Sequence, residues 1–173
     1  MTAATTSATL PPEIGHKGAQ AAVLACVMHL PLVEAARITA QLQDEDFTVP
    51  ALRVVLGVVR ALALEGVPLE PVLIVDRMRS TGQASCFTAD QGPDRVVADL
   101  YTSASVPASA GYYVRAIKKS SARRQAQTDG IRTQQGAEGQ ISGGLADDDL
   151  ADLLDATAVS MIASARVLRG VAA

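Results

Sequence analysis

The chain has 173 residues, of which 49% are hydrophobic and only 3% aromatic, and its formal net charge is −3. This length fits one domain with at most one appendage, and the mildly acidic balance does not mark the whole chain as a nucleic-acid binder. Two cysteines, Cys26 and Cys86, give no disulfide framework, and no apolar run approaches the roughly 18 residues of a membrane span. With no signal-peptide pattern at the start, these features predict a cytoplasmic protein without membrane contact.

The chain order predicts an all-α protein, with a disordered polar tail at 1–12 and a compact head of five or six helices at 13–110. The helix at 51–65 is expected to be the most buried, with Thr48 as its N-cap and Phe47 as an anchor beneath it. Apolar residues at helical spacing, bounded by prolines and glycines, predict the head helices at 19–30, 32–43, 51–65, 71–79 and 93–101. The β-branched pairs lie within this helical spacing, so no strand is expected.

Two further helical arms, at 112–135 and 147–168, predict an α-hairpin over residues 111–169. The segment 136–144 joins them and is rich in glycine, which lowers helix stability by about 1 kcal/mol per residue relative to alanine, so the first arm is expected to end there. Helices of this kind are marginal in isolation, so the apolar stripe of the hairpin is expected to lie against a second copy. The predicted dimer interface comprises Tyr113, Ile117, Leu150, Leu154, Ala158, Met161, Ala165 and Leu168.

Charge is distributed unevenly along the hairpin. Aspartates gather next to the turn, and basic residues lie far from it, so an antiparallel dimer of hairpins would bring opposite signs together. The alternative is a solvated helix face whose ends suit the helix dipole. The basic residues of the first arm are candidate contacts to DNA phosphates or to a partner, although they equally suit a soluble helix face or the dimer itself. They are Arg115, Lys118, Lys119, Arg123 and Arg124.

No pattern indicates catalysis, a cofactor or a metal. Cys26 and His29 are one helical turn apart, but no second pair stands at ligand spacing, so packing is the better interpretation. The acidic groups at 44–46 and 147–149 immediately precede helices, where carboxylates favour the dipole. The sequence has no Gly-x-x-x-x-Gly-Lys-Ser/Thr loop, and the segment 118–120 lacks the glycines that cradle phosphates. We therefore expect a protein that is not an enzyme.

Five short motifs follow one another along the chain. They are the pair Pro11-Pro12, the segment AQAAVLA at 19–25, the pair Asp46-Phe47, the turn GVPLE at 66–70, and VPASAGYYVRAIKK at 106–119 with Arg123-Arg124 after it. In this order they resemble the N-terminal domain of bacterial replicative DNA helicases of the DnaB type. Three features depart from that pattern: Gln20 replaces a glutamate, Glu70 replaces a capping aspartate, and 84–92 lacks a Gly-Gly turn.

The resemblance implies a helical head with a dimerising hairpin, and a non-catalytic assembly role in DNA replication. In that family the domain forms the N-terminal collar of a hexamer and contacts primase, whereas the ATPase domain of the family has no counterpart here. The implied partners are a second copy, as a dimer or a trimer of dimers, and primase or a replicative helicase; any nucleic-acid contact is expected to be weak. Two alternatives stay open, a DNA-binding regulator that uses the basic first arm and an inert fragment of a helicase. The short segment 169–173 after the hairpin favours a natural stop.

Overall fold

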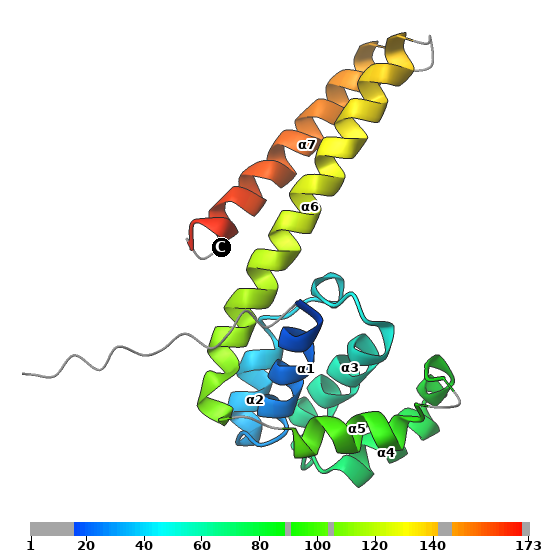
Figure 1. Ribbon diagram of the computed structural model, residues 1–173, viewed down its shortest axis with the longest axis vertical. Helices are drawn as coiled ribbons and strands as arrows, with labels where there is room; N and C mark the ends of the chain where they lie inside the picture. The colour runs from blue at the N-terminus through cyan, green and yellow to red at the C-terminus, as the bar shows by residue number, and fades with distance from the viewer. Residues whose placement is uncertain (1–15, 89–90, 104–105, 142–146, 171–173) are drawn as a thin grey trace, which may run out of the picture.

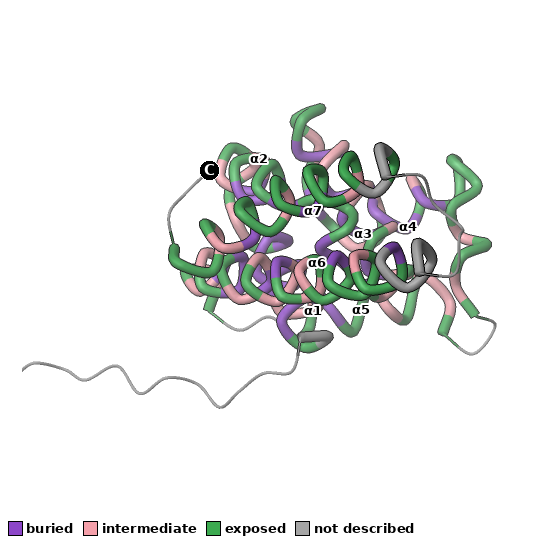
Figure 2. The backbone as a smooth tube through the Cα atoms, turned by 90° about the horizontal axis from the view of Figure 1, so that it is seen from above, coloured by how far each residue is buried: buried purple, intermediate pink, exposed green. Residues whose placement is uncertain are grey.

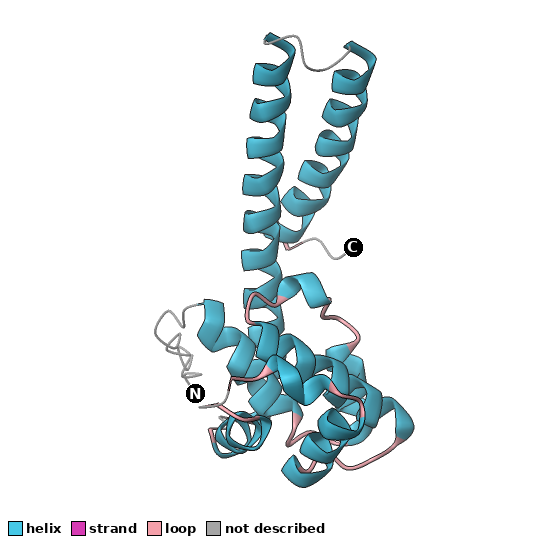
Figure 3. Cartoon of the chain, turned by 90° about the vertical axis from the view of Figure 1, so that its right-hand side faces the viewer, coloured by secondary structure: helices cyan, strands magenta, loops and turns pink. Residues whose placement is uncertain are grey.

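The computed structural model describes residues 16–88, 91–103, 106–141 and 147–170, so the predicted tail at 1–12 lies outside the described residues. Within these ranges the chain is helical and has no strand, which confirms the all-α prediction (Figure 3). A head of five helices carries a long two-helix hairpin that projects away from it (Figure 1). The helices are α1 His16–Val27, α2 Leu32–Thr39, α3 Pro50–Glu65, α4 Pro71–Ser80, α5 Pro93–Thr102, α6 Ala110–Ile141 and α7 Asp147–Leu168, with 3-10 turns η1 Asp44–Asp46, η2 Gln83–Cys86 and η3 Pro107–Ser109. None of the helices in these ranges is long and apolar enough to cross a bilayer.

Two helices, α1 and α3, contribute the largest shares of the core of the head. The sequence predicts α3 as the most buried, and it does bury seven residues between Leu52 and Ala63. However, α1 is buried at least as thoroughly, because every residue from Val23 to Val27 is 0% exposed. The reason is its position: α1 packs against α3, α5 and α6 and is enclosed by them. Helical spacing identifies an apolar helix but not how many neighbours will cover it.

The turn before α3 differs from the prediction. Phe47 is 0% exposed, as an anchor should be, but the N-cap is Val49 and no side chain caps the helix. Thr48 is used elsewhere: its hydroxyl accepts a hydrogen bond from Nε2 of Gln20 in α1, at 3.2 Å. Pro50 occupies the first position of the helix, where its missing N–H costs nothing.

The other end of α3 follows the prediction. Gly66 ends the helix with φ at 74°, a left-handed conformation that glycine adopts without a steric penalty. The chain then turns into α4, which begins at Pro71 as expected. Arg77 of α4 reaches back to Glu65 through two hydrogen bonds of 2.8 and 2.6 Å, and these bonds lower the pKa of the Glu65 carboxyl.

Helix α6 belongs to both parts of the molecule, because its first half packs on α1 and its second half packs on α7 (Figure 1). Ala110, Tyr113, Val114 and Ile117 are members of the hydrophobic core of the head, so that core does not stop at residue 110. Tyr113 is 6% exposed and Ile117 is 0% exposed. Both side chains, predicted for the dimer interface, are thus enclosed by the core of the protomer itself.

The first arm of the hairpin is longer than predicted. The sequence places its end at 135, but α6 continues through Gly136 to Ile141. Gly136 is buried where α6 runs alongside α7. Packing of this kind offsets the roughly 1 kcal/mol by which a glycine weakens an isolated helix. The rest of the predicted connecting segment, 142–144, lies outside the described residues.

Candidate functional site

The inner face of the hairpin, where α7 meets α6, is closed by small side chains. On α7 the buried positions are Thr157 at 8% exposed and Ser164 at 6%. On α6 they are Ala122, Asp129 and Gly136, which recur at helical spacing along the same face. Most of the rest of α7 is exposed (Figure 2). Small residues let the two helices approach closely, so the larger apolar side chains of α7 are left to point elsewhere.

Three of those larger side chains lie on an apolar stripe along α7. We define the stripe by Leu154, Ala158, Met161, Ala165 and Leu168, which recur at three- and four-residue spacing. Leu154 is 44% exposed, Met161 46% and Leu168 37%, so the described part of the protomer leaves a large share of each side chain open to solvent. The structure therefore places this part of the predicted interface on the surface. The side chain of Leu150 lies outside what the structure describes.

Two further apolar residues of α7 are exposed and were missed by the sequence reasoning. Val159 is 69% exposed and Ile162 is 55% exposed. Each follows a stripe residue directly, so each is turned by about 100° around the helix axis from it. The signal was present in the sequence as large side chains beside the stripe, but the prediction assumed a narrow one. Both residues therefore lie outside the stripe as defined.

A buried carboxylate joins the two helices of the hairpin. Asp129 of α6 is 4% exposed, and its carboxylate accepts hydrogen bonds from Ser160 Oγ at 2.5 Å and from Gln125 Nε2 at 2.9 Å. It forms no ion pair within the described ranges. A buried carboxylate is tolerated only where donors satisfy it, so the Ser160 bond, which crosses from α7 to α6, favours one register of the two helices.

A second polar cluster ties the hairpin to the head. Asp46 of η1 is 4% exposed, and its carboxylate lies 2.6 Å from Nζ of Lys118 in α6. Arg124, also in α6, donates from Nη2 to the backbone carbonyls of Glu45 and Asp46, at 3.2 Å each. Lys118 and Arg124, two of the five candidate contacts for DNA or a partner, thus make polar contacts inside the protomer. The other three candidates are exposed on α6: Arg115, Lys119 and Arg123.

Comparison with known proteins agrees with this architecture. The family described as DnaB-like helicase N terminal domain matches residues 16–119, which is more than half of the chain. The chain belongs to this family. The match covers the head and the base of α6, and it corresponds to the non-ATPase part of the helicase. No curated protein matches the chain.

A solved structure shows the same fold as this DnaB-like domain. The crystal structure of the N-terminal domain of DnaB helicase from Mycobacterium tuberculosis is 20% identical, with a TM-score of 0.68. The alignment covers 84% of this chain and 94% of that one. It therefore extends beyond residue 119, where the family match ends, into the hairpin.

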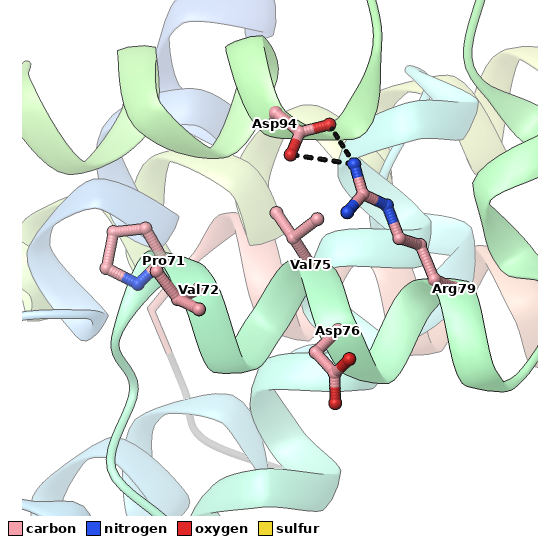
Figure 4. Close-up of a pocket in the computed structure, with 6 residues that line it drawn as sticks. All are labelled: Pro71, Val72, Val75, Asp76, Arg79 and Asp94. Atoms are coloured by element: carbon pink, nitrogen blue, oxygen red, sulfur yellow. Dashed lines mark hydrogen bonds and ion pairs between the residues drawn. The ribbon is translucent and has the colours of Figure 1, made fainter.

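The head of this DnaB-like domain has a hollow of about 280 Å³ between α4 and α5 (Figure 4). Arg79 donates from one nitrogen to both carboxylate oxygens of Asp94, at 2.7 and 2.9 Å. Asp76 points away from this pair, and the opposite wall is apolar. Because the Arg79 and Asp94 side chains are 60% and 62% exposed, the ion pair contributes little to stability. The residues that line the hollow include no serine, threonine, cysteine, histidine or lysine.

Cys26 and His29 are placed in packing contacts of the head. The Cys26 sulfur is buried and lies 3.6 Å from the Val106 carbonyl oxygen. The ring of His29 lies against that of Tyr101, with centroids 4.3 Å apart, and its Nε2 is 2.9 Å from the Tyr101 carbonyl oxygen. Across the residues that the structure describes, no three His, Cys, Asp or Glu side chains gather as a metal site would require.

Replacing Ser160 with alanine should lower the free energy of unfolding of this DnaB-like domain by about 1–2 kcal/mol, because the buried Asp129 carboxylate then keeps one side-chain donor of two. Urea denaturation followed by circular dichroism measures the change. Ser121→Ala is the matched control, since Ser121 is half-buried on α6 and makes no hydrogen bond within the described ranges. Equal losses for the two variants would contradict the role given to Ser160.

Proposed function

We propose that this chain is a non-catalytic assembly module of DNA replication, which pairs with a second copy through the exposed apolar stripe of α7. The observation that carries the proposal is the exposure of Leu154, Met161 and Leu168 on a helix whose inner face is already closed by small residues. Exposed apolar surface of this kind commonly marks a protein–protein interface. Ala158 and Ala165, which alternate with the large residues, leave room for a partner helix to approach.

Charge supports an antiparallel arrangement of the two hairpins. Asp149, Asp152 and Asp155 are exposed near the tip of the hairpin, and Arg166 and Arg169 are exposed near its base. None of these five residues forms an ion pair within the described part of the chain. Head-to-tail pairing brings the acidic tip of one hairpin to the basic base of the other, which favours that orientation over a parallel one.

The proposal extends to a replication partner, either primase or a replicative helicase, and to a trimer of such dimers. Membership of the helicase N-terminal domain family supports both extensions. In this proposal the chain acts by taking a place in such an assembly. Its effect on the partner then depends on whether the stripe pairs with another free copy or with the hairpin of a full helicase.

Met161→Asp tests the proposed interface. A carboxylate in the middle of the stripe would be desolvated on dimerisation, so we expect the dimer dissociation constant to rise at least tenfold, a change of about 1.4 kcal/mol. Sedimentation at several protein concentrations measures the constant, and circular dichroism checks that the head stays folded. Val159→Asp is the matched control, because it makes a similar change on the same helix about 160° away from Met161.

Two outcomes would count against the proposal. A Met161→Asp variant that stays as dimeric as the parent chain would remove the stripe from the interface. A dissociation constant that does not rise with salt concentration would remove the electrostatic basis for the antiparallel arrangement.

A further inference from the structure

Beyond this assembly role, we propose that one face of α6 binds the phosphate backbone of a single-stranded nucleic acid. We call it the basic face and define it by Tyr112, Arg115, Lys119 and Arg123. The chain as a whole is acidic, with a net charge of −3, so such an interaction depends on a local concentration of positive charge. The structure shows how that concentration arises.

The three cations of the basic face form a row. Arg115, Lys119 and Arg123 recur every four residues, which places them on one side of the helix in steps of about 6 Å. All three are exposed, and none makes an ion pair or a hydrogen bond within the described ranges. Their charges therefore remain available to a polyanion.

The head separates these cations from the other basic residues of the same helix. Lys118 and Arg124 turn toward η1, where Asp46 and the carbonyls of Glu45 and Asp46 occupy their donors. Helix α6 carries no acidic residue before Asp129, so nothing on its own surface neutralises the row. The five basic residues therefore divide into two groups. Lys118 and Arg124 contact the head, and the three cations of the basic face point to solvent.

An aromatic ring lies at the start of the row. Tyr112 is 36% exposed and precedes Arg115 by three residues, so the two side chains share one side of the helix. Its ring meets the buried ring of Tyr113 edge-on, with centroids 5.6 Å apart, which holds it in place. Proteins that bind single-stranded nucleic acids combine an aromatic ring with nearby cations. An unpaired base stacks on the ring, and the phosphates contact the cations.

This combination favours a single strand over two other polyanions. A duplex keeps its base faces stacked inside, so it gains nothing from Tyr112. An acidic peptide offers carboxylates to the cations but has no base to place on the ring. The proposal therefore predicts a preference that charge alone would not produce.

Fluorescence anisotropy with a labelled thymidine oligomer of about 15 nucleotides tests the proposal on the full chain. For three phosphate contacts on a single strand, the logarithm of the binding constant should fall with the logarithm of the salt concentration with a slope of about −2. Affinity should therefore fall roughly 20-fold between 50 and 200 mM salt. The same measurement is repeated with a uridine oligomer of equal length. The oligomer that binds more tightly identifies the preferred nucleic acid as DNA or RNA. Tyr112→Ala should weaken binding by about tenfold through lost stacking.

Lys119→Glu should weaken binding at least tenfold, because it places a negative charge in the middle of the row. Arg132→Glu is the matched control: Arg132 is also exposed on α6 but lies outside the basic face, so its effect should stay within about twofold. Equal losses for these two variants would overturn the proposal. So would tighter binding of a duplex of the same length, or displacement of the oligomer by polyglutamate as readily as by unlabelled oligomer.

Discussion

Phe47→Ala is expected to lower the free energy of unfolding by about 3–5 kcal/mol, the largest stability loss that a single core change in the head should produce. The Phe47 ring is 0% exposed and is the bulkiest of the fully buried side chains. It lies between η1 and α3, where the chain is held by Gln20 and Arg53, so the surroundings cannot easily collapse into the space left behind. The loss therefore includes a cavity term as well as lost apolar burial.

Urea denaturation followed by circular dichroism measures the loss, with Phe87→Ala as the matched control. Phe87 packs against the same core but is only partly buried, so the identical truncation should cost clearly less. If the two variants lose equal stability, Phe47 does not anchor the turn before α3. A drop in the denaturant slope for Phe47→Ala alone would instead indicate that its native state has loosened.

Local signals were enough to predict most of the head. Pro50, Pro71 and Pro93 each occupy the first position of a helix, and Gly66 ends α3 in the left-handed conformation. These residues act through their own backbone preferences, which a sequence states directly. The start and type of an element were therefore predictable wherever proline or glycine marked it.

The hairpin was predicted less well, because periodicity shows that a face is apolar but not what covers it. Tyr113 and Ile117 lie on an apolar face just as Leu154 and Met161 do, yet the first two face α1 and the other two face solvent. Gly136 shows the same limit. A glycine weakens an isolated helix, but the sequence does not show that Gly136 is buried beside α7, where packing stabilises the helix. In both cases the packing neighbours are distant in sequence.

The polar clusters had even weaker signals. Asp46 and Lys118 are 72 residues apart, and nothing local to either one indicates the other. Acidic residues before a helix are most simply explained by the helix dipole, as the sequence analysis assumed for 44–46. The carboxylate of Asp46 connects the head to the hairpin because α6 packs against η1 in the folded chain.

Lys118→Met should therefore lower the free energy of unfolding by about 2–4 kcal/mol, far more than loss of an ordinary surface cation. The Asp46 side chain is 5% exposed and Lys118 is 30% exposed, so removing the ammonium leaves a nearly buried carboxylate without its counter-ion. One backbone donor remains, the N–H of Gln43 at 2.7 Å, and it cannot replace a charge. Methionine keeps much of the apolar stem of lysine, so the loss reports mainly on the ion pair.

Lys119→Met is the matched control, because the neighbouring ammonium is exposed and has no partner within the described ranges, and its loss should stay within about 0.5 kcal/mol. Adding Asp46→Asn to Lys118→Met should recover part of the lost stability, since a neutral amide needs no cation. If Lys118→Met and Lys119→Met unfold at the same urea concentration, the ion pair between Lys118 and Asp46 does not contribute measurably to stability. The orientation of the hairpin would then depend on the continuity of α6 alone.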